Sequence, residues 1–151
     1  MLVRCLYASR PAKPMTSALT NEILKQSCAN NPGRGITGLL CFTSEIFVQV
    51  IEGGRDEICK LFNKIVRDER NKDVCLLVYE EIKERHFGSW TMGQVKLDGI
   101  NPGVMLKYYE KAEFNPFSAP GHATMSMMME LVATGAIGSH VGAQAGRDPV
   151  D

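Results

Sequence analysis

The hydrophobic pattern of the chain alternates between strand-like and helix-like segments. Five short apolar runs, each rich in β-compatible residues, predict five strands. They cover residues 2–9, 36–42, 47–51, 74–79 and 87–97. The break between the second and third runs is short enough to form a hairpin.

Two other segments carry apolar residues at the spacing of an amphipathic helix. The first begins beside Thr16 or Ser17, either of which can cap it. We expect it to end at Asn30, because residues 30–33 are of types that end helices and form turns. The second helix follows Gly53-Gly54 and closes within the charged residues 67–70. The predicted order is therefore strand, helix, strand, strand, helix, strand, strand.

This order predicts the fold. Two helices packed on one face of a mixed sheet bury both apolar helix stripes at once, so we expect an α+β, ferredoxin-like βαββαββ sandwich. Residues 1–97 should form this domain. Residues 98–135 should carry two short helices, and we expect a disordered tail over residues 136–151, which show no period.

The second of these C-terminal helices carries methionines. We expect Met125, Met128, Met129 and Val132 on one side of it. A methionine stripe at helical spacing is compatible with an ordinary core contact and with a pliable surface that packs against a partner. The pattern leaves both interpretations open.

Composition narrows the function classes. The 151 residues include 17 basic and 17 acidic side chains, so no net field favours nucleic acid. No apolar stretch reaches the length that spans a bilayer and no leader precedes the first strand, so we expect a cytoplasmic protein that binds neither membrane nor nucleic acid. The five cysteines are an odd number without CxxC pairs, and we expect reduced core residues.

Two patterns resemble chemical motifs, but the residues and predicted elements around them do not support the corresponding function. Residues 33–38 spell GxGxxG, but they follow a predicted helix and open a strand, the reverse of what a dinucleotide site requires. His86, His122 and His140 have no neighbouring ligand at metal spacing. Since no Ser or Cys stands in a recognisable nucleophile elbow, we expect neither a metal site nor an enzymatic reaction.

Two polar side chains in apolar strands need partners. Gln49 shares a strand face with Phe47 and Ile51, and Tyr7 lies in the middle of the first strand. A buried amide and a buried hydroxyl both require hydrogen-bond partners. Neighbouring strands can bring these two side chains together, and taken alone such a pair is more often structural than functional.

The ordered set of motifs resembles the BLUF family (blue-light sensing using flavin) over about residues 1–97. The resemblance rests on Tyr7 and on residues 30–32, 35–40, 47–53, 65–70 and 90–92, in that order. It implies a stand-alone blue-light receptor without an enzymatic effector. It also implies signalling to a downstream protein, with residues 98–135 as the output or oligomerisation segment, and we expect a homo-oligomer.

The same resemblance implies a cofactor and roles for individual residues. FAD, with FMN or riboflavin as alternatives, binds non-covalently between the two helices. Tyr7 gives up an electron and a proton, Gln49 rotates or tautomerises, and Trp90 and Met92 relay the change to the last strand. The implied cofactor-binding residues are Ser27, Asn30, Asn31, Lys64 and Asp68.

Two positions depart from the family pattern. Lys64 stands where the family often has arginine, and Asn71 stands where histidine is common. An ammonium group cannot make the forked contact of a guanidinium. Both departures concern the polar edge of the cofactor and the choice between FAD and FMN.

A flavin-free ferredoxin-like interaction module is the alternative from a different class. An RNA-binding version would show exposed aromatic residues with basic neighbours, for which Phe42 and Phe47 are candidates. A hydrolase of the acylphosphatase type would need an anion-cradling loop after the first strand, where Pro11 removes a backbone donor. A yellow colour of the purified protein would remove these alternatives.

Overall fold

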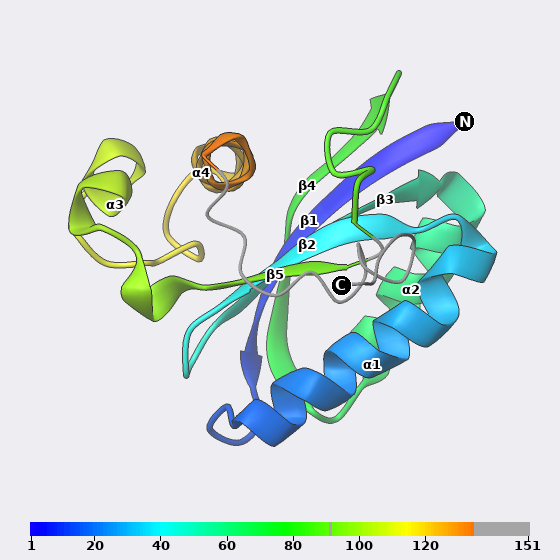
Figure 1. The fold of residues 1–151 in the computed structure, drawn as a ribbon, viewed down its shortest axis with the longest axis horizontal. Helices are drawn as coiled ribbons and strands as arrows, with labels where there is room; N and C mark the ends of the chain where they lie inside the picture. The colour runs from blue at the N-terminus through cyan, green and yellow to red at the C-terminus, as the bar shows by residue number, and fades with distance from the viewer. Residues whose placement is uncertain (91, 135–151) are drawn as a thin grey trace.

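The computed structural model describes residues 1–90 and 92–134, which form a five-stranded sheet with helices on both faces (Figure 1). The strands are β1 (Leu2–Pro11), β2 (Thr37–Phe42), β3 (Phe47–Gly54), β4 (Asn71–Ile82) and β5 (Gly93–Lys96). The helices are α1 (Ser17–Arg34), α2 (Arg55–Arg67), α3 (Pro102–Tyr108) and α4 (Gly121–Ala133), and η1 (Leu97–Gly99) is a 3₁₀ helix.

The strands lie in the order β4-β1-β3-β2-β5. β1 pairs antiparallel with β3 and β4, β2 pairs antiparallel with β3, and β5 runs parallel to β2. Helices α1 and α2 cover one face of this sheet, and α3 and α4 lie on the other side (Figure 1). The predicted ferredoxin-like α+β arrangement is confirmed.

Each face of the sheet has its own apolar cluster, so the central strands are buried on both sides. The face under α1 and α2 includes Leu24 and Ile51. The opposite face includes Val50 together with Met127 and Met128 of α4. The C-terminal helices therefore share a core with the sheet.

The methionines of α4 are mostly core residues. Met125, Met127 and Met128 are buried against the sheet, whereas Met129 is 38% exposed. The predicted stripe was therefore displaced, because it included Met129 and omitted Met127. Since the second sheet face needs an apolar cover, the structure favours the core interpretation of the buried methionines.

Helix α1 is longer than predicted. It continues through Asn30, Asn31 and Pro32, and it is capped by Gly35 in the left-handed conformation, with φ of 67°. The backbone N–H of Gly35 donates to the carbonyl of Pro32, and that of Ile36 donates to Asn31. These two bonds form a Schellman motif, which satisfies the carbonyls of Asn31 and Pro32 in the last turn of the helix. The prediction that the helix ends at Asn30 was therefore wrong.

The fifth strand is shorter than predicted, because a buried carboxylate competes for its first backbone donors. The side chain of Glu52 accepts from the backbone N–H of His86 at 3.1 Å and of Phe87 at 2.8 Å. It also accepts from Arg4 Nε at 2.8 Å. Residues 83–90 consequently form bends and turns, and the strand predicted over 87–97 is restricted to Gly93–Lys96.

Helix α4 meets β4 at a glycine. The register between β1 and β4 shifts between Leu6 and Tyr7, so Leu77 is an extra residue that bulges from β4. A Cβ atom on Gly121, the first residue of α4, would lie 2.5 Å from the carbonyl oxygen of Leu77. Glycine is therefore required for this close approach of the helix to the strand.

We expect Gly121→Ala to lower the free energy of unfolding by about 1–3 kcal/mol, because the added methyl must displace backbone atoms rather than a flexible side chain. Gly99→Ala is the matched control, since a Cβ there meets no atom within 4 Å. Urea unfolding of both variants measures the difference. Equal stabilities for the two variants would contradict a tight contact at Leu77.

The cysteines only partly follow the expectation of core positions. Cys5 and Cys41 are buried, whereas Cys59 on α2 is exposed. Burial raises the pKa of the Cys5 thiol to about 12, with a smaller contribution from Cys59. The prediction that all five are core residues is thus wrong for Cys59, which lies on the solvent side of its helix.

Other expectations can be compared only with the described part of the chain. No helix within residues 1–90 and 92–134 is long and apolar enough to cross a membrane. The same residues contain no group of three side chains arranged to hold a metal ion. The tail expected at residues 136–151 lies outside the described residues.

Candidate functional site

A pocket lies between α1, α2 and the sheet. Apolar side chains of both helices and of the sheet form much of its wall, among them Ile23, Leu40, Phe47, Leu61 and Ile65. Seven residues to which the family resemblance assigns a role in the switch or in cofactor binding also line it: Tyr7, Ser27, Asn30, Asn31, Gln49, Lys64 and Asp68. The fold therefore brings these side chains together from β1, β3, both helices and the turn after α2.

A chain of buried hydrogen bonds lies at the sheet wall of this pocket. Antiparallel pairing places Tyr7 on β1 directly beside Gln49 on β3. The Tyr7 hydroxyl donates to Gln49 Oε1 at 2.5 Å, and Gln49 Nε2 donates to Met92 Sδ at 3.3 Å. All three side chains are buried. The chain thus connects β1 to the residue that directly precedes β5.

The Gln49 amide presents its carbonyl end to Tyr7 and its amino end to Met92. Burial raises the pKa of Tyr7 well above its usual value, and Cys5 and Asp68 add to this effect. The phenol therefore keeps its proton, which it donates to the carbonyl end of Gln49 in this structure. The amino end faces a sulfur atom, a weak acceptor, so the donor capacity of Gln49 is only partly used within the described residues.

Trp90 and Met92 lie on opposite faces of the sheet. Met92 is fully buried in the cluster beneath α1 and α2 and contacts Gln49. Trp90 packs against the cluster beneath α4. Its ring limits the space at Gly93, where a Cβ atom would lie 3.2 Å from Trp90 Cγ. Of the two residues, Met92 is therefore the one adjacent to the pocket residue Gln49.

The amides of α1 lie at different depths. Asn31 is buried, with 4% of its surface exposed, whereas Asn30 is exposed and Ser27 is half-buried. Because α1 remains helical through this segment, Ser27 and Asn31 stand one turn apart on the same face. Asn31 and Ser27 therefore line the pocket from one helix, and the exposed Lys64 lines it from α2.

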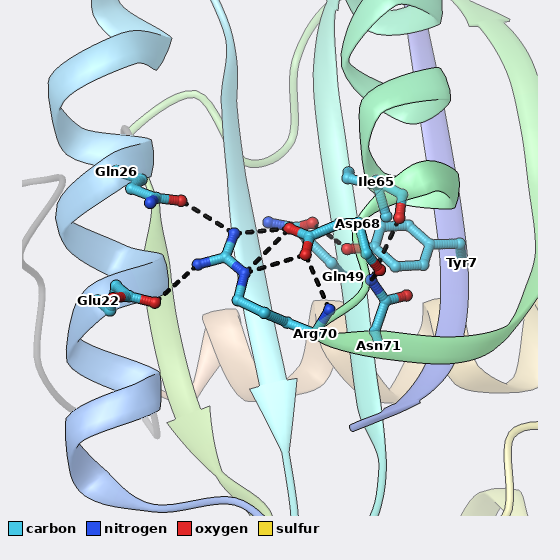
Figure 2. Close-up of polar contacts among 8 residues, drawn as sticks. All are labelled: Tyr7, Glu22, Gln26, Gln49, Ile65, Asp68, Arg70 and Asn71. Carbon is cyan, nitrogen blue, oxygen red and sulfur yellow. Dashed lines mark hydrogen bonds and ion pairs between the residues drawn. The ribbon is translucent and has the colours of Figure 1, made fainter. Parts of the chain in front are cut away.

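Arg70, which the sequence analysis did not single out, connects the turn after α2 to α1 (Figure 2). It donates to Asp68 Oδ2 at 2.6 Å, to Glu22 Oε1 at 3.0 Å and to Gln26 Oε1 at 2.9 Å. The hydrogen bond from Arg70 holds the pKa of Asp68 below its usual range. The Asp68 carboxylate is thus engaged within the protein, beside the pocket.

Asn71 caps the end of α2 and leaves one atom unsatisfied. Its amino group donates to the carbonyls of Ile65 at 3.1 Å and Asp68 at 3.0 Å (Figure 2). Its Oδ1 atom is buried without a hydrogen-bond partner among the described residues, and Asn71 lines the pocket. A buried acceptor without a partner is costly, so a donor on a bound ligand would stabilise this site.

These features fit a flavin. The isoalloxazine has broad apolar faces, which suit the walls formed by Ile23, Leu40, Leu61 and Ile65. One edge of the ring carries carbonyl acceptors and an N–H donor, which suit a free amide hydrogen of Gln49 and the unsatisfied oxygen of Asn71. The side chains present therefore match the chemistry of the ring and of its polar edge.

Comparisons with known proteins support this assignment. The family model BLUF, described as sensors of blue-light using FAD, matches residues 2–93. Photoactivated adenylate cyclase subunit alpha of Euglena gracilis is 36% identical over 88 residues, which are 58% of this chain and 9% of that protein. The chain therefore spans less than two thirds of the curated relatives that it matches.

Two solved structures cover most of the chain. The photo-activated state of BlsA superposes with a TM-score of 0.76 at 27% identity, over 87% of this chain and 95% of that one. BlrB, a BLUF protein in its dark state, gives a TM-score of 0.71 at 25% identity, over 89% of this chain and 96% of the other. The similarity extends beyond the matched residues 2–93 to part of the C-terminal segment.

Proposed function

Since this chain belongs to the BLUF family of sensors of blue-light using FAD, we propose that it is a blue-light receptor with Gln49 as its switch. The observation that carries the proposal is the buried hydrogen-bond chain from Tyr7 through Gln49 to Met92 at the wall of the pocket. In this chain of hydrogen bonds, the side-chain amide of Gln49 contacts Tyr7 at one end and Met92 at the other. A change in that amide therefore has a defined structural consequence.

We assign the residues that hold the cofactor from their place in the pocket. When bound, the flavin supplies the absorption of blue light and an acceptor for one electron. Asn31, which is buried, and Gln49 serve its carbonyl edge, while Ser27, Asn30 and Lys64 lie farther out along the helices. FAD is the proposed cofactor, with FMN or riboflavin as alternatives.

Tyr7 is the proposed donor of the photochemical electron. The phenol ring loses an electron, and its hydroxyl proton then moves along the 2.5 Å hydrogen bond to Gln49 Oε1. Its raised pKa disfavours loss of the proton before the electron has left. Electron and proton both return, so Tyr7 is regenerated and no covalent bond to the cofactor forms.

Gln49 then differs from its starting state by rotation or by tautomerisation. If it rotates, Nε2 donates to the Tyr7 hydroxyl oxygen and Oε1 turns towards Met92. The sulfur of Met92 has no hydrogen to donate, so the contact at 3.3 Å between Gln49 and Met92 is lost. If it tautomerises, the atoms stay in place and the positions of the protons change. Either route alters what Gln49 presents to the cofactor.

The proposed signal leaves through β5. Met92 directly precedes β5, which continues through η1 into α3. A rearranged hydrogen-bond network contributes about 1–3 kcal/mol, which can bias an interface but cannot drive a large unfolding step. We therefore propose that the signal reaches a downstream protein, or a contact within a homo-oligomer, by binding rather than by catalysis.

An absorption spectrum before and after blue illumination tests this function. We expect a flavin spectrum that shifts to the red and returns in the dark. A colourless protein that also fails to take up added flavin would contradict the receptor function and leave a flavin-free interaction module. A flavin spectrum without a reversible shift would contradict the role of the Tyr7, Gln49 and Met92 chain.

A further inference from the structure

Glu52 anchors the segment that follows β4 to strand β3. Its side chain is fully buried. Oε1 accepts from the backbone N–H of Phe87 at 2.8 Å, and Oε2 accepts from the backbone N–H of His86 at 3.1 Å. The counter-charge is Arg4 on β1, whose Nε donates to Oε2 at 2.8 Å. One carboxylate on β3 therefore joins β1, β3 and the backbone of residues 86 and 87.

Further bonds hold the same segment on either side of this anchor. Arg85 Nη1 donates to the backbone carbonyl of Glu52 at 3.2 Å. The carbonyl of Trp90 accepts from the backbone N–H of Gly38 on β2 at 3.0 Å. Residues 83–90 belong to neither β4 nor β5. Their course is therefore set by these individual bonds rather than by the regular ladder of a strand.

Strand β3 carries this anchor and the switch on opposite faces. Gln49 and Glu52 are three residues apart, so Gln49 faces the pocket and Glu52 faces the side that α4 covers. Met92, two residues beyond Trp90, lies on the pocket side and accepts from Gln49 Nε2 at 3.3 Å. The segment thus leaves one face of β3 at Glu52 and ends on the other face at Gln49. The contact between Gln49 and Met92 therefore depends on a carboxylate of the same strand.

We propose that Glu52 is a positioning residue of the switch, because it holds residues 86–90 so that Met92 lies against Gln49. The part of this proposal that concerns light rests on the function proposed above. A carboxylate suits the task because it only accepts hydrogen bonds, and bonds to a charged acceptor are strong. A glutamine at this position offers one acceptor oxygen, and its amino group faces other donors. Weakening the anchor should therefore release Met92 without altering Tyr7 or Gln49.

The first experiment measures the surroundings of Met92 in the dark, on the full-length chain with ¹³C-labelled methionine methyl groups. Glu52→Gln is compared with Glu80→Gln by NMR, and Met92→Leu identifies the Met92 signal. Glu80 accepts from the same Arg4 at 3.0 Å, but within the described residues it has no hydrogen bond to residues 86 and 87. Only Glu52→Gln should shift or broaden the Met92 signal. A signal that is unchanged in Glu52→Gln, or that moves equally in both variants, would overturn the proposal.

The second experiment measures the rate at which the red shift decays in the dark. In the rotated state proposed above, the contact between Gln49 and Met92 is lost, so recovery includes its re-formation. Glu52→Gln should therefore slow recovery by about tenfold, which corresponds to the contribution of one hydrogen bond to a charged group. Glu80→Gln should recover at the rate of the unaltered chain. A Glu52→Gln protein that recovers at the same rate as Glu80→Gln would contradict the assigned role of Glu52.

A double-mutant cycle with Met92→Leu decides whether Glu52 acts through Met92. This substitution keeps an apolar side chain of similar size beneath α1 and α2 and removes the sulfur that accepts from Gln49. In the Met92→Leu background, Glu52→Gln should change the recovery rate by less than about twofold. The same factor in both backgrounds would assign the effect of Glu52 to general stability and overturn the proposal.

A second variant covers the case in which Glu52→Gln does not fold. Arg4→Met/Glu52→Gln also removes the cation left without its buried partner, and the same results are expected from it in both experiments. A failure of the receptor function is separately visible, because the unaltered chain would then show no reversible red shift. The Met92 signal in the dark would still decide whether Glu52 positions Met92.

Discussion

Tyr7→Phe should abolish the reversible red shift and leave flavin bound. The substitution removes the hydroxyl that donates to Gln49 Oε1 and keeps the ring, which packs edge-on against Phe62 with centroids 5.9 Å apart. Without a proton to give, the residue cannot transfer one to Gln49, so the amide stays in its starting state. Absorption spectra before and after illumination measure the result, and the flavin-to-protein ratio checks occupancy.

Tyr109→Phe is the matched control for this variant. It removes a hydroxyl that lies 2.8 Å from Thr124 Oγ1, on the side of the sheet that α4 covers. The red shift should persist in this control. A Tyr7→Phe protein that retains flavin and the full shift would refute the assigned role of Tyr7.

Glu52→Ala should lower the free energy of unfolding by about 3–5 kcal/mol. Glu52 is fully buried, and its loss leaves the Arg4 guanidinium without its nearest counter-charge. It also removes the acceptor for the backbone N–H groups of His86 and Phe87. Arg4 would keep only the bond from its Nη1 to the half-exposed Glu80 at 3.0 Å, since its Nη2 already lacks a hydrogen-bond partner within the described residues. Urea unfolding of the purified variant gives the measurement.

Two further variants distinguish the stability contribution of the buried ion pair from that of an exposed ion pair. Glu81→Ala breaks an ion pair with Arg55 whose side chains are 62% and 47% exposed, and it should cost less than about 1 kcal/mol. Arg4→Met/Glu52→Leu removes both buried charges and should recover part of the loss. A Glu52→Ala protein as stable as Glu81→Ala would show that the buried carboxylate contributes little.

The fold of residues 1–97 could be predicted from the sequence, because the apolar residues in this segment recur at clear strand and helix spacings. The errors arise where a tertiary contact outweighs a local signal. Pro32 and Asn30 favour a helix stop, but the Schellman motif at Gly35 lets α1 continue to Arg34. The start of β5 was misplaced because Glu52, far away in the sequence, takes the backbone donors of residues 86 and 87.

The site was only partly accessible to sequence reasoning. Tyr7 and Gln49 could be paired because each is polar in an apolar strand, and burial demands a partner. The contacts of Arg70 could not be predicted in this way. Its partners Glu22 and Gln26 lie 48 and 44 residues away, and nothing in the charged run 67–70 specifies them.

The position of Trp90 provides an intrinsic optical probe. It is the only tryptophan in the chain, and it packs on the α4 side of the sheet, two residues before Met92 on the other side. Indole emission from this protein therefore originates at one place. Time-resolved fluorescence can follow repacking beneath α4 during illumination without any attached dye.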